Sequence, residues 1–281
     1  MNNNEKNKPS AVPQIILVVL LGLMCIVILL PFCWSASTSL RLPADSFKMP
    51  PSFFPTSFYT DNYVAVFTRF PFVRFITNSL FVALTVTLGG LIVSTMAAFS
   101  FARIDFRGKN GLFIMLMAGL MIPYYATMIS VYIIMSRLKL VGSLWALILP
   151  ALINPLHIFL IRQFMMTIPK SYEEAAEIDG SSRFGIYLRV IVPMSKPVMM
   201  LAALQAFIGS WNNFIAPLIY LSDWNKMTLP IGLKLLRGYM GTGNVSEILA
   251  GITVSLLMPI ILYLFGQRYL VEGVALTGLK S

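Results

Sequence analysis

The sequence predicts an all-helical integral membrane protein with six transmembrane helices. Of its 281 residues, 57% are hydrophobic and 11% are charged, with a mean hydropathy of +0.79. A soluble chain of this size could not cover so much apolar surface. Apolar stretches of about 20 residues, which cross roughly 30 Å of hydrocarbon, occur at residues 14–34, 76–100, 112–135, 143–161, 197–221 and 248–266.

The first apolar stretch has a second interpretation, as a cleaved signal peptide. Lys6 and Lys8 precede it, and residues 34–37 offer small side chains beyond it. Its apolar core at 15–30 is long for a signal peptide, and five more candidate spans follow. These features favour an uncleaved first helix, preceded by a cytoplasmic segment at 1–13.

The formal net charge of +10 could indicate nucleic-acid binding, but the 21 Lys and Arg residues are scattered in ones and twos between apolar stretches. This distribution excludes a nucleic-acid module and is typical of anchoring at a membrane surface. Arg103, Arg107 and Lys109 outnumber Asp105 in the short segment 102–111, which indicates the cytoplasmic side. Both chain termini are then cytoplasmic.

This topology assigns a side of the membrane to each long connection. The external loops are 35–75, which is rich in proline and predicted to be irregular with short interfacial helices, and 222–246, which contains Gly238, Gly241 and Gly243. A cytoplasmic loop spans 162–196, and a cytoplasmic tail spans 267–281. The six spans together form a transmembrane domain at 14–266.

The predicted membrane cores lack the charged groups that ion-coupled carriers usually hold at membrane depth. Charges occur only at the ends of the spans, where Lys196 and Glu247 lie. His157, between Pro155 and Phe159, is the one candidate proton relay, although a structural or interfacial histidine is favoured. The energy for transport must then come from elsewhere, or the protein is passive.

Helix breakers and amides inside the spans leave two interpretations open. The prolines either reflect the ordinary frequency of proline in membrane helices or bend helices around a cavity; they are Pro123, Pro150, Pro155, Pro217 and Pro259. Polar side chains in the fifth span need partners at membrane depth; they are Gln205, Ser210, Asn212 and Asn213. We expect Asn212 and Asn213, and less strongly Gln205, to face a translocation pathway or a partner subunit.

The cytoplasmic loop at 162–196 has the pattern of a short amphipathic helix followed by a sharp corner. Ser171 and Glu174 have capping-box spacing, so a helix of two to three turns should begin near Ser171. Gly180 can supply a left-handed turn at its end. Ser181 and Ser182 can cap a second helix that leads to Pro193.

The predicted faces of this helix differ in chemistry. The glutamates, which are Glu173, Glu174 and Glu177, are expected on one face, and Ala175 and Ala176 leave a smooth surface beside them. A short helix held by a turn at a membrane face has a shape that fits a groove in another protein.

These residues carry a resemblance to a known family. Glu174-Ala175-Ala176, Gly180 after three residues, and Val190-Ile191-Val192-Pro193 after nine more resemble the EAA loop of ABC importer permeases. The departures, Val190 for Ile and Val192 for Leu, are conservative. The resemblance implies a type I ABC importer permease in the bacterial inner membrane, with a cytoplasmic coupling helix between spans four and five.

Further segments are similar to the carbohydrate, maltose-type branch of these permeases. They are Asn78-Ser79, Trp211-Asn212-Asn213-Phe214 with Pro217-Leu218, and Val271-Glu272-Gly273 with Thr277-Gly278-Leu279-Lys280. The resemblance implies an importer for a carbohydrate or related polyol. Its expected partners are a second permease in a heterodimer, two ATPase subunits, an external substrate-binding protein and membrane lipid.

The resemblance also implies which residues meet the ATPase subunits. Coupling residues are expected at Ser171, Glu173, Glu174, Ala175, Ala176, Glu177, Asp179 and Gly180. A second contact is expected from the tail at Glu272, Gly273, Thr277 and Gly278.

Catalysis is expected in the partners, because this chain has no GxxxxGK[ST] phosphate-binding loop. The chain is therefore predicted to be neither an enzyme nor a metal or cofactor carrier, with ATP and Mg bound by the ATPase. The alternative is a carrier or channel that works alone. A membrane enzyme is disfavoured because the sequence lacks paired carboxylates, metal ligands and a nucleophile with a base.

Overall fold

The computed structural model describes residues 11–46, 53–55, 58–236 and 244–278. Helices make up most of these ranges, and the described residues contain no strand, which confirms the predicted all-helical class. The described residues divide into two compact units. The glycines expected in the second external loop, Gly238, Gly241 and Gly243, lie outside the described residues, as do most of segment 1–13 and residues 279–281.

The first unit comprises residues up to Phe70 together with Leu236–Val254. It contains α1 (Ala11–Ser39), a 3₁₀ turn (Pro43–Asp45), α2 (Asp61–Arg69) and the beginning of α14 (Val245–Gly278). The apolar side chains of α1 from Ile15 to Leu30 are exposed. A helix that is apolar all round suits a lipid or protein environment rather than water.

Part of the loop predicted at 35–75 is held by buried hydrogen bonds within this unit. The Asn62 amide donates to the carbonyls of Ser39 and Arg41, both at 2.8 Å, and so ties α2 to the end of α1. The hydroxyls of Ser46 and Ser246 lie 2.6 Å apart. Where it is described, the predicted loop at 35–75 contains the end of α1, a 3₁₀ turn, α2 and the beginning of α3, with irregular segments between them.

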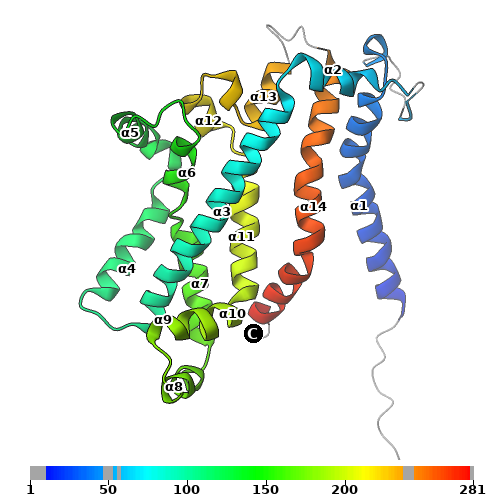
Figure 1. The fold of residues 1–281 in the computed structure, drawn as a ribbon. Coiled ribbons are helices and arrows are strands. Elements are labelled where there is room, and N and C mark those ends of the chain that lie inside the picture. Colours follow the sequence, from blue (N-terminus) through cyan, green and yellow to red (C-terminus); the bar gives the residue numbers. More distant parts are fainter. Residues whose placement is uncertain (1–10, 47–52, 56–57, 237–243, 279–281) are drawn as a thin grey trace, which may run out of the picture. The chain divides into compact units, whose positions relative to one another are not determined.

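The second unit comprises Pro71–Leu235 and the end of α14 from Ser255. Its longest helix, α3 (Phe72–Arg103), packs against both α7 (Pro155–Thr167) and α11 (Lys196–Trp211) (Figure 1). The other elements, in chain order, are α4 (Lys109–Ala118), a 3₁₀ turn (Gly119–Met121), α5 (Tyr124–Arg137), α6 (Trp145–Ala151), α8 (Ser171–Ile178), α9 (Arg183–Ile186), a π-helical segment (Tyr187–Ile191), α10 (Val192–Met194), α12 (Ile215–Tyr220), a 3₁₀ turn (Trp224–Lys226) and α13 (Leu229–Leu236).

Four helical segments are long and apolar enough to cross a membrane, and the number rises to six if each of two bent pairs is one span. One bent pair joins α4 with its 3₁₀ turn to α5 at 106°, and the other joins Arg183–Met194 to α11 at 78°. The predicted span at 112–135 is therefore not one straight helix. The predicted span at 197–221 is also interrupted, between Trp211 and Ile215.

Proline explains the sharper bend. Pro123 precedes α5, and Ile122 has the extended backbone (ψ 116°) that is favoured in a residue before proline. Pro150 and Pro259, by contrast, lie inside α6 and α14. The helix α7 runs to Thr167, so Arg162, expected at the start of the cytoplasmic loop, lies within a helix.

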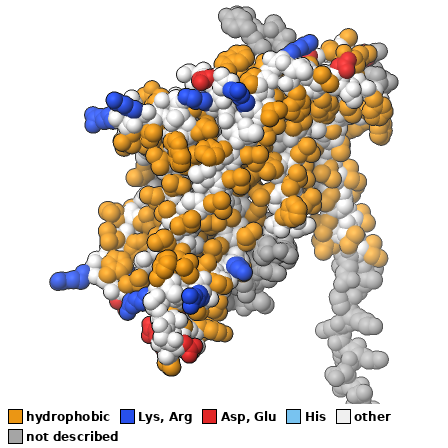
Figure 2. Space-filling model, in the orientation of Figure 1, with side chains coloured by type: hydrophobic (Ala, Val, Ile, Leu, Met, Phe, Trp, Pro, Cys, Tyr) orange, Lys and Arg blue, Asp and Glu red, His pale blue; other side chains and the backbone are white. Residues whose placement is uncertain are grey.

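The core of the second unit forms where small side chains let helices approach closely. Ala98 of α3 and Ala202 of α11 are fully buried, in one cluster with Ile161 and Met165 of α7. Tyr187 joins them, with its hydroxyl 2.8 Å from that of Thr95. Over this unit, Lys, Arg, Asp and Glu side chains gather near the ends of the helices, with hydrophobic side chains between them (Figure 2).

A glycine on α13 provides a test of this packing. A Cβ at Gly232 would clash with the ring of Phe75, which is fully buried. We expect Gly232→Ala to cost about 1–3 kcal/mol through overpacking and to lower the melting temperature of the detergent-purified protein. Gly111→Ala in α4 is the control, because no atom lies within 4 Å of its added Cβ. Equal melting temperatures would contradict the packing described.

Candidate coupling site and polar pocket

The helix α8 carries the residues expected to couple transport to ATP hydrolysis, and it lies at one end of the second unit (Figure 1). It begins at Ser171, as predicted, but the predicted capping box is wrong. Lys170 is the capping residue, and no side-chain hydrogen bond caps the helix. Lys170 already has helical backbone angles, and its carbonyl accepts from the amides of Glu173 and Glu174. Ser171 is thus one residue too late to act as the cap.

The corner after α8 is formed as the sequence predicted. Gly180 has a φ of +78°, and its N–H donates to Glu177 while the N–H of Ser181 donates to Ala176. These two bonds form a Schellman motif, which satisfies the last carbonyls of the helix. The Ser182 hydroxyl then accepts from the Gly185 amide at 3.2 Å and caps α9.

One face of α8 is open to a partner. Ile178 is 87% exposed, and Glu174 and Ala175 are exposed beside it. Helical spacing places these three side chains on one face. Ala176 instead packs against the core of the second unit. The exposed face is therefore apolar at Ile178 and Ala175 with the Glu174 carboxylate beside them, whereas Glu177 lines a cavity together with Glu173 and Arg103.

The three glutamates do not share one face, contrary to expectation. The Glu173 carboxylate turns inward and lies 2.8 Å from Nε of Arg103, whose side chain is 6% exposed. Glu173 is therefore bonded within the chain, and Glu174 is left as an exposed acid on the open face. The sequence pattern alone could not reveal this, because Arg103 ends a helix 70 residues earlier in the chain.

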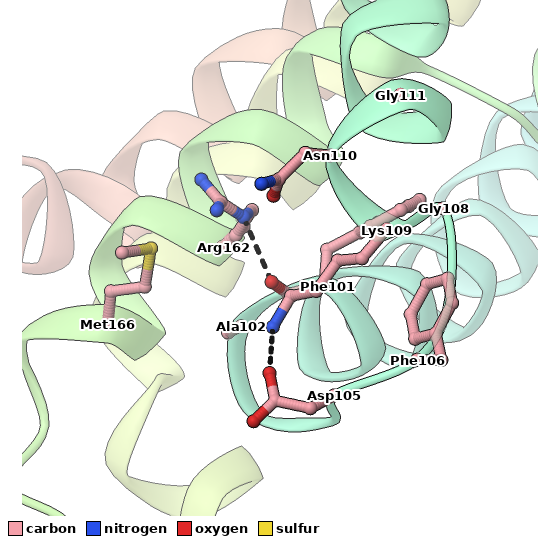
Figure 3. Close-up of a pocket in the computed structure, with 10 residues that line it drawn as sticks. All are labelled: Phe101, Ala102, Asp105, Phe106, Gly108, Lys109, Asn110, Gly111, Arg162 and Met166. Atoms are coloured by element: carbon pink, nitrogen blue, oxygen red, sulfur yellow. Dashed lines mark hydrogen bonds and ion pairs between the residues drawn. The ribbon is translucent and has the colours of Figure 1, made fainter.

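Two arginines join the ends of α3 and α7. Arg103, the last residue of α3, donates to the carbonyls of Met165 and Ile168 at 2.6 and 2.7 Å. Arg162 of α7 donates in return to the carbonyl of Phe101 at 3.2 Å (Figure 3). Each arginine thus satisfies carbonyls near the C-terminal end of the neighbouring helix, where a positive charge is also favoured by the helix dipole.

A cavity of about 440 Å³ lies beside Arg162. Figure 3 shows Arg162 and Lys109 at its wall, each already engaged by the chain, since Lys109 lies 3.2 Å from Asp105. The Arg162 guanidinium also lies 4.1 Å from the centre of the Phe113 ring. The cations around this cavity therefore stabilise the end of the helix bundle.

A second cavity, of about 220 Å³, is lined by side-chain amides from the predicted membrane spans. Gln205, Asn212 and Asn213 are all exposed in the chain, and of the three only Gln205 and Asn213 line this cavity. Their place in a translocation pathway stays a prediction. His157, which is 6% exposed, lines the same cavity. The wall includes Asn154 and Ser210 and contains no charged side chain.

Two asparagines of this cavity also shape the helices around it. Oδ1 of Asn154 accepts from the amides of Leu156 and His157 and caps α7. Oδ1 of Asn213 accepts from the Ala216 amide at 3.3 Å, where α12 begins. Sequence analysis missed Asn154, although an asparagine directly before Pro155 is a helix-start signal.

The tail residues expected to make a second ATPase contact lie on α14, which continues to Gly278. The side chains of Glu272, Gly273, Thr277 and Gly278 lie outside the described residues. Their role stays a prediction.

Comparison with known proteins identifies the family. Residues 90–274 match the binding-protein-dependent transport system inner membrane component. The chain belongs to this family. The matched region includes the EAA loop and α8. The match confirms the family that the EAA loop predicted.

Similar proteins include permeases of sugar transport systems. An arabinooligosaccharide transport system permease from Halalkalibacterium halodurans is 33% identical over 230 residues, which cover 82% of each chain. A trehalose/maltose transport system permease from Thermococcus litoralis is 28% identical over 98% of this chain and 99% of that protein.

A solved structure supports the fold. A chain from the crystal structure of a bacterial ABC transporter involved in the import of the acidic polysaccharide alginate matches with a TM-score of 0.83. The match is 22% identical in sequence and covers 94% of this chain and 98% of that one. The all-helical ABC permease fold is thereby confirmed.

The helix break at Asn213 yields a second prediction. We expect Asn213→Ala to destabilise the purified protein by about 1 kcal/mol, because the start of α12 loses a side-chain acceptor. Asn213→Ser should retain most of the stability, since serine can accept the same bond. Asn212→Ala, which changes the adjacent asparagine, is the control. Thermal unfolding followed by size-exclusion chromatography measures the difference, and an undiminished melting temperature for Asn213→Ala would refute it.

Proposed function

We propose that this chain is one of two transmembrane subunits of an ATP-driven importer for a carbohydrate or related polyol. The observation that carries the proposal is the open face of α8, which the Gly180 corner holds at the end of a packed helix bundle. The chain would pair with a second, different permease, two ATPase subunits that bind ATP and Mg, and an external substrate-binding protein.

The substrate class is supported by the cavity and by the relatives together. Amides, a hydroxyl and an imidazole line the cavity without a charged group, and such groups can exchange hydrogen bonds with sugar hydroxyls. Two relatives bear names of arabinooligosaccharide and trehalose/maltose transport. An uncharged carbohydrate fits both observations.

The coupling step follows from the chemistry of α8. Ile178 and Ala175 offer an apolar centre that a cleft on an ATPase subunit can bury, and Glu174 can meet a cation at the rim of that cleft. Closure of the ATPase pair would then move α8. The tail from residue 271 onward would make the second contact.

Reconstitution tests the proposal against a carrier or channel that works alone. The complex purified through this chain would be placed in proteoliposomes with its external binding protein, and uptake of labelled maltose and arabino-oligosaccharides would be followed. We expect uptake of a sugar to require ATP on the side of the ATPase subunits and to survive a proton uncoupler. Uptake without ATP that the uncoupler abolishes would establish the carrier instead.

The topology gives a third prediction. In a variant whose native cysteines, Cys25 and Cys33, are replaced by alanine, a cysteine at Arg107 should react with an impermeant maleimide only from the cytoplasmic side. A cysteine at Ser222 should react only from outside. Both positions are exposed in the chain, so access depends on the side of the membrane. The reversed pattern would refute the proposed orientation with both termini cytoplasmic.

The Gly180 corner gives a fourth prediction. Gly180→Val should leave the chain inserted and paired with the second permease, while ATP-driven uptake fails. No atom lies within 4 Å of a Cβ at this position, so the effect comes from the left-handed backbone, which strains an L-residue by about 1–2 kcal/mol. Gly180→Asn, which tolerates this conformation better, should retain most of the uptake.

Three measurements separate the outcomes of this substitution, namely membrane content, recovery of the ATPase with the chain, and uptake rate. Wild-type uptake by Gly180→Val would remove the coupling role of the corner. Loss of membrane insertion would show that the corner is needed for folding instead.

A further inference from the structure

We propose that Arg103 is a positioning residue that locks α8 to the membrane helices α3 and α7, so that all three move as one body. The inference rests on the proposed function, because it names the link through which movement of α8 would reach the membrane. Glu173, which the family resemblance placed among the ATPase contacts, becomes the internal half of this link.

The geometry supports a lock rather than a surface ion pair. The Arg103 side chain is 6% exposed and that of Glu173 is 18% exposed, with 2.8 Å between Nε and the carboxylate. The same guanidinium donates to the carbonyls of Met165 and Ile168. One planar group thus joins the last residue of α3, the end of α7 and the first turn of α8. Exposed pairs contribute little to structure, but this arginine is shielded from water and combines the ion pair to Glu173 with two hydrogen bonds to backbone carbonyls, which holds its partners in fixed geometry.

The chain offers α8 few other attachments. A two-residue turn, Pro169 and Lys170, precedes it, and the Gly180 corner follows it. Ala176 packs on the core beside α9 and the π-helical segment. Through Arg103, by contrast, α8 is bonded to α3, which packs against both α7 and α11. A displacement of α8 therefore reaches the membrane helices directly through α3 as well as along the chain through Gly180.

The neighbouring acids provide an internal comparison. Glu174 is exposed and lies on the open face of α8 with Ile178. Arg107 is exposed four residues beyond Arg103. Removal of Glu174 or Arg107 changes the same kinds of charge as removal of Glu173 or Arg103, but it leaves the lock intact.

Distance measurement between spin labels tests the lock. Labels would be attached to cysteines at Leu88 of α3 and Tyr172 of α8, which are 61% and 51% exposed, in a variant with Cys25 and Cys33 replaced by alanine. Leu88 lies about 22 Å along α3 from Arg103 at 1.5 Å per residue, so the pair reports the position of α8 against the body of the helix. Distances would be recorded by double electron–electron resonance in the assembled complex, both nucleotide-free and trapped with Mg-ADP-vanadate.

We expect a narrow distribution with the same mean in both states for the unsubstituted chain, because α3 and α8 move together. Arg103→Gln and Glu173→Ala should each broaden the distribution and make its mean differ between the two states. Arg103→Lys keeps a positive charge opposite Glu173, but one ammonium group cannot reach the Glu173 carboxylate and both backbone carbonyls. This variant should recover part of the narrow distribution. Arg107→Gln should match the unsubstituted chain in the assembled complex, and Glu174→Gln, which changes the docking face, should match it in the permease alone.

A narrow, state-independent distance in both Arg103→Gln and Glu173→Ala would overturn the proposal. If Arg103→Gln fails to insert, Glu173→Ala carries the test, since it leaves the bonds from Arg103 to α7 in place. Failure of the proposed function gives a different result. In that case no ATPase would be purified together with the unsubstituted chain, and no vanadate-trapped state would form. The width of the distance distribution in the permease alone would still decide whether Arg103 positions α8.

Discussion

The end of a membrane helix leaves backbone carbonyls without partners inside the helix, and in this chain two such ends meet. The helices α3 and α7 terminate side by side, and Arg103 and Arg162 each donate to carbonyls of the other helix. Buried carbonyls without partners would be costly, so this exchange fixes both helix ends. The position of α8 depends on it, because α8 begins three residues after Ile168, whose carbonyl Arg103 holds.

Because Arg103 also pairs with Glu173, the residues of α8 divide into one that is bonded within the chain and others that stay open for a proposed partner. Glu173 is used within the chain, while Glu174, Ala175 and Ile178 remain open. An acidic, partly apolar helix face that its own chain leaves uncovered suits a partner protein. The membrane part of the chain shows a related division. Its polar cavity has hydrogen-bonding groups but no charge of its own with which to drive transport. In the proposed importer, a neighbouring ATPase would supply the energy, and this would account for both features.

The sequence predicted features that depend on neighbouring residues, and it missed those that depend on distant ones. Gly180 and Ser182 behave as predicted, because a left-handed turn and a helix cap are determined within a few residues. The capping box at Ser171 failed since the preceding Lys170 had already entered the helix. The inward turn of Glu173 required knowledge that the end of α3 lies beside α8, and no local pattern carries that information.

The membrane spans show the same limit. Apolar length located the helices, yet it could not show that Pro123 bends one span by 106° or that the helix stops at Asn212. These interruptions depend on how neighbouring helices supply partners for the freed backbone groups. Gln205 and Asn213 line one cavity with His157 and Asn154, and this meeting follows from the packing of α7 against α11.

An experimental structure of the complex recovered from membranes through this chain would test the account most directly. It should show Ile178 and Glu174 within about 4 Å of an ATPase subunit, the range of packing contact, while the Glu173 carboxylate remains on Arg103. A complex in which Glu173 leaves Arg103 to bind the ATPase, or in which α8 touches no other subunit, would contradict it.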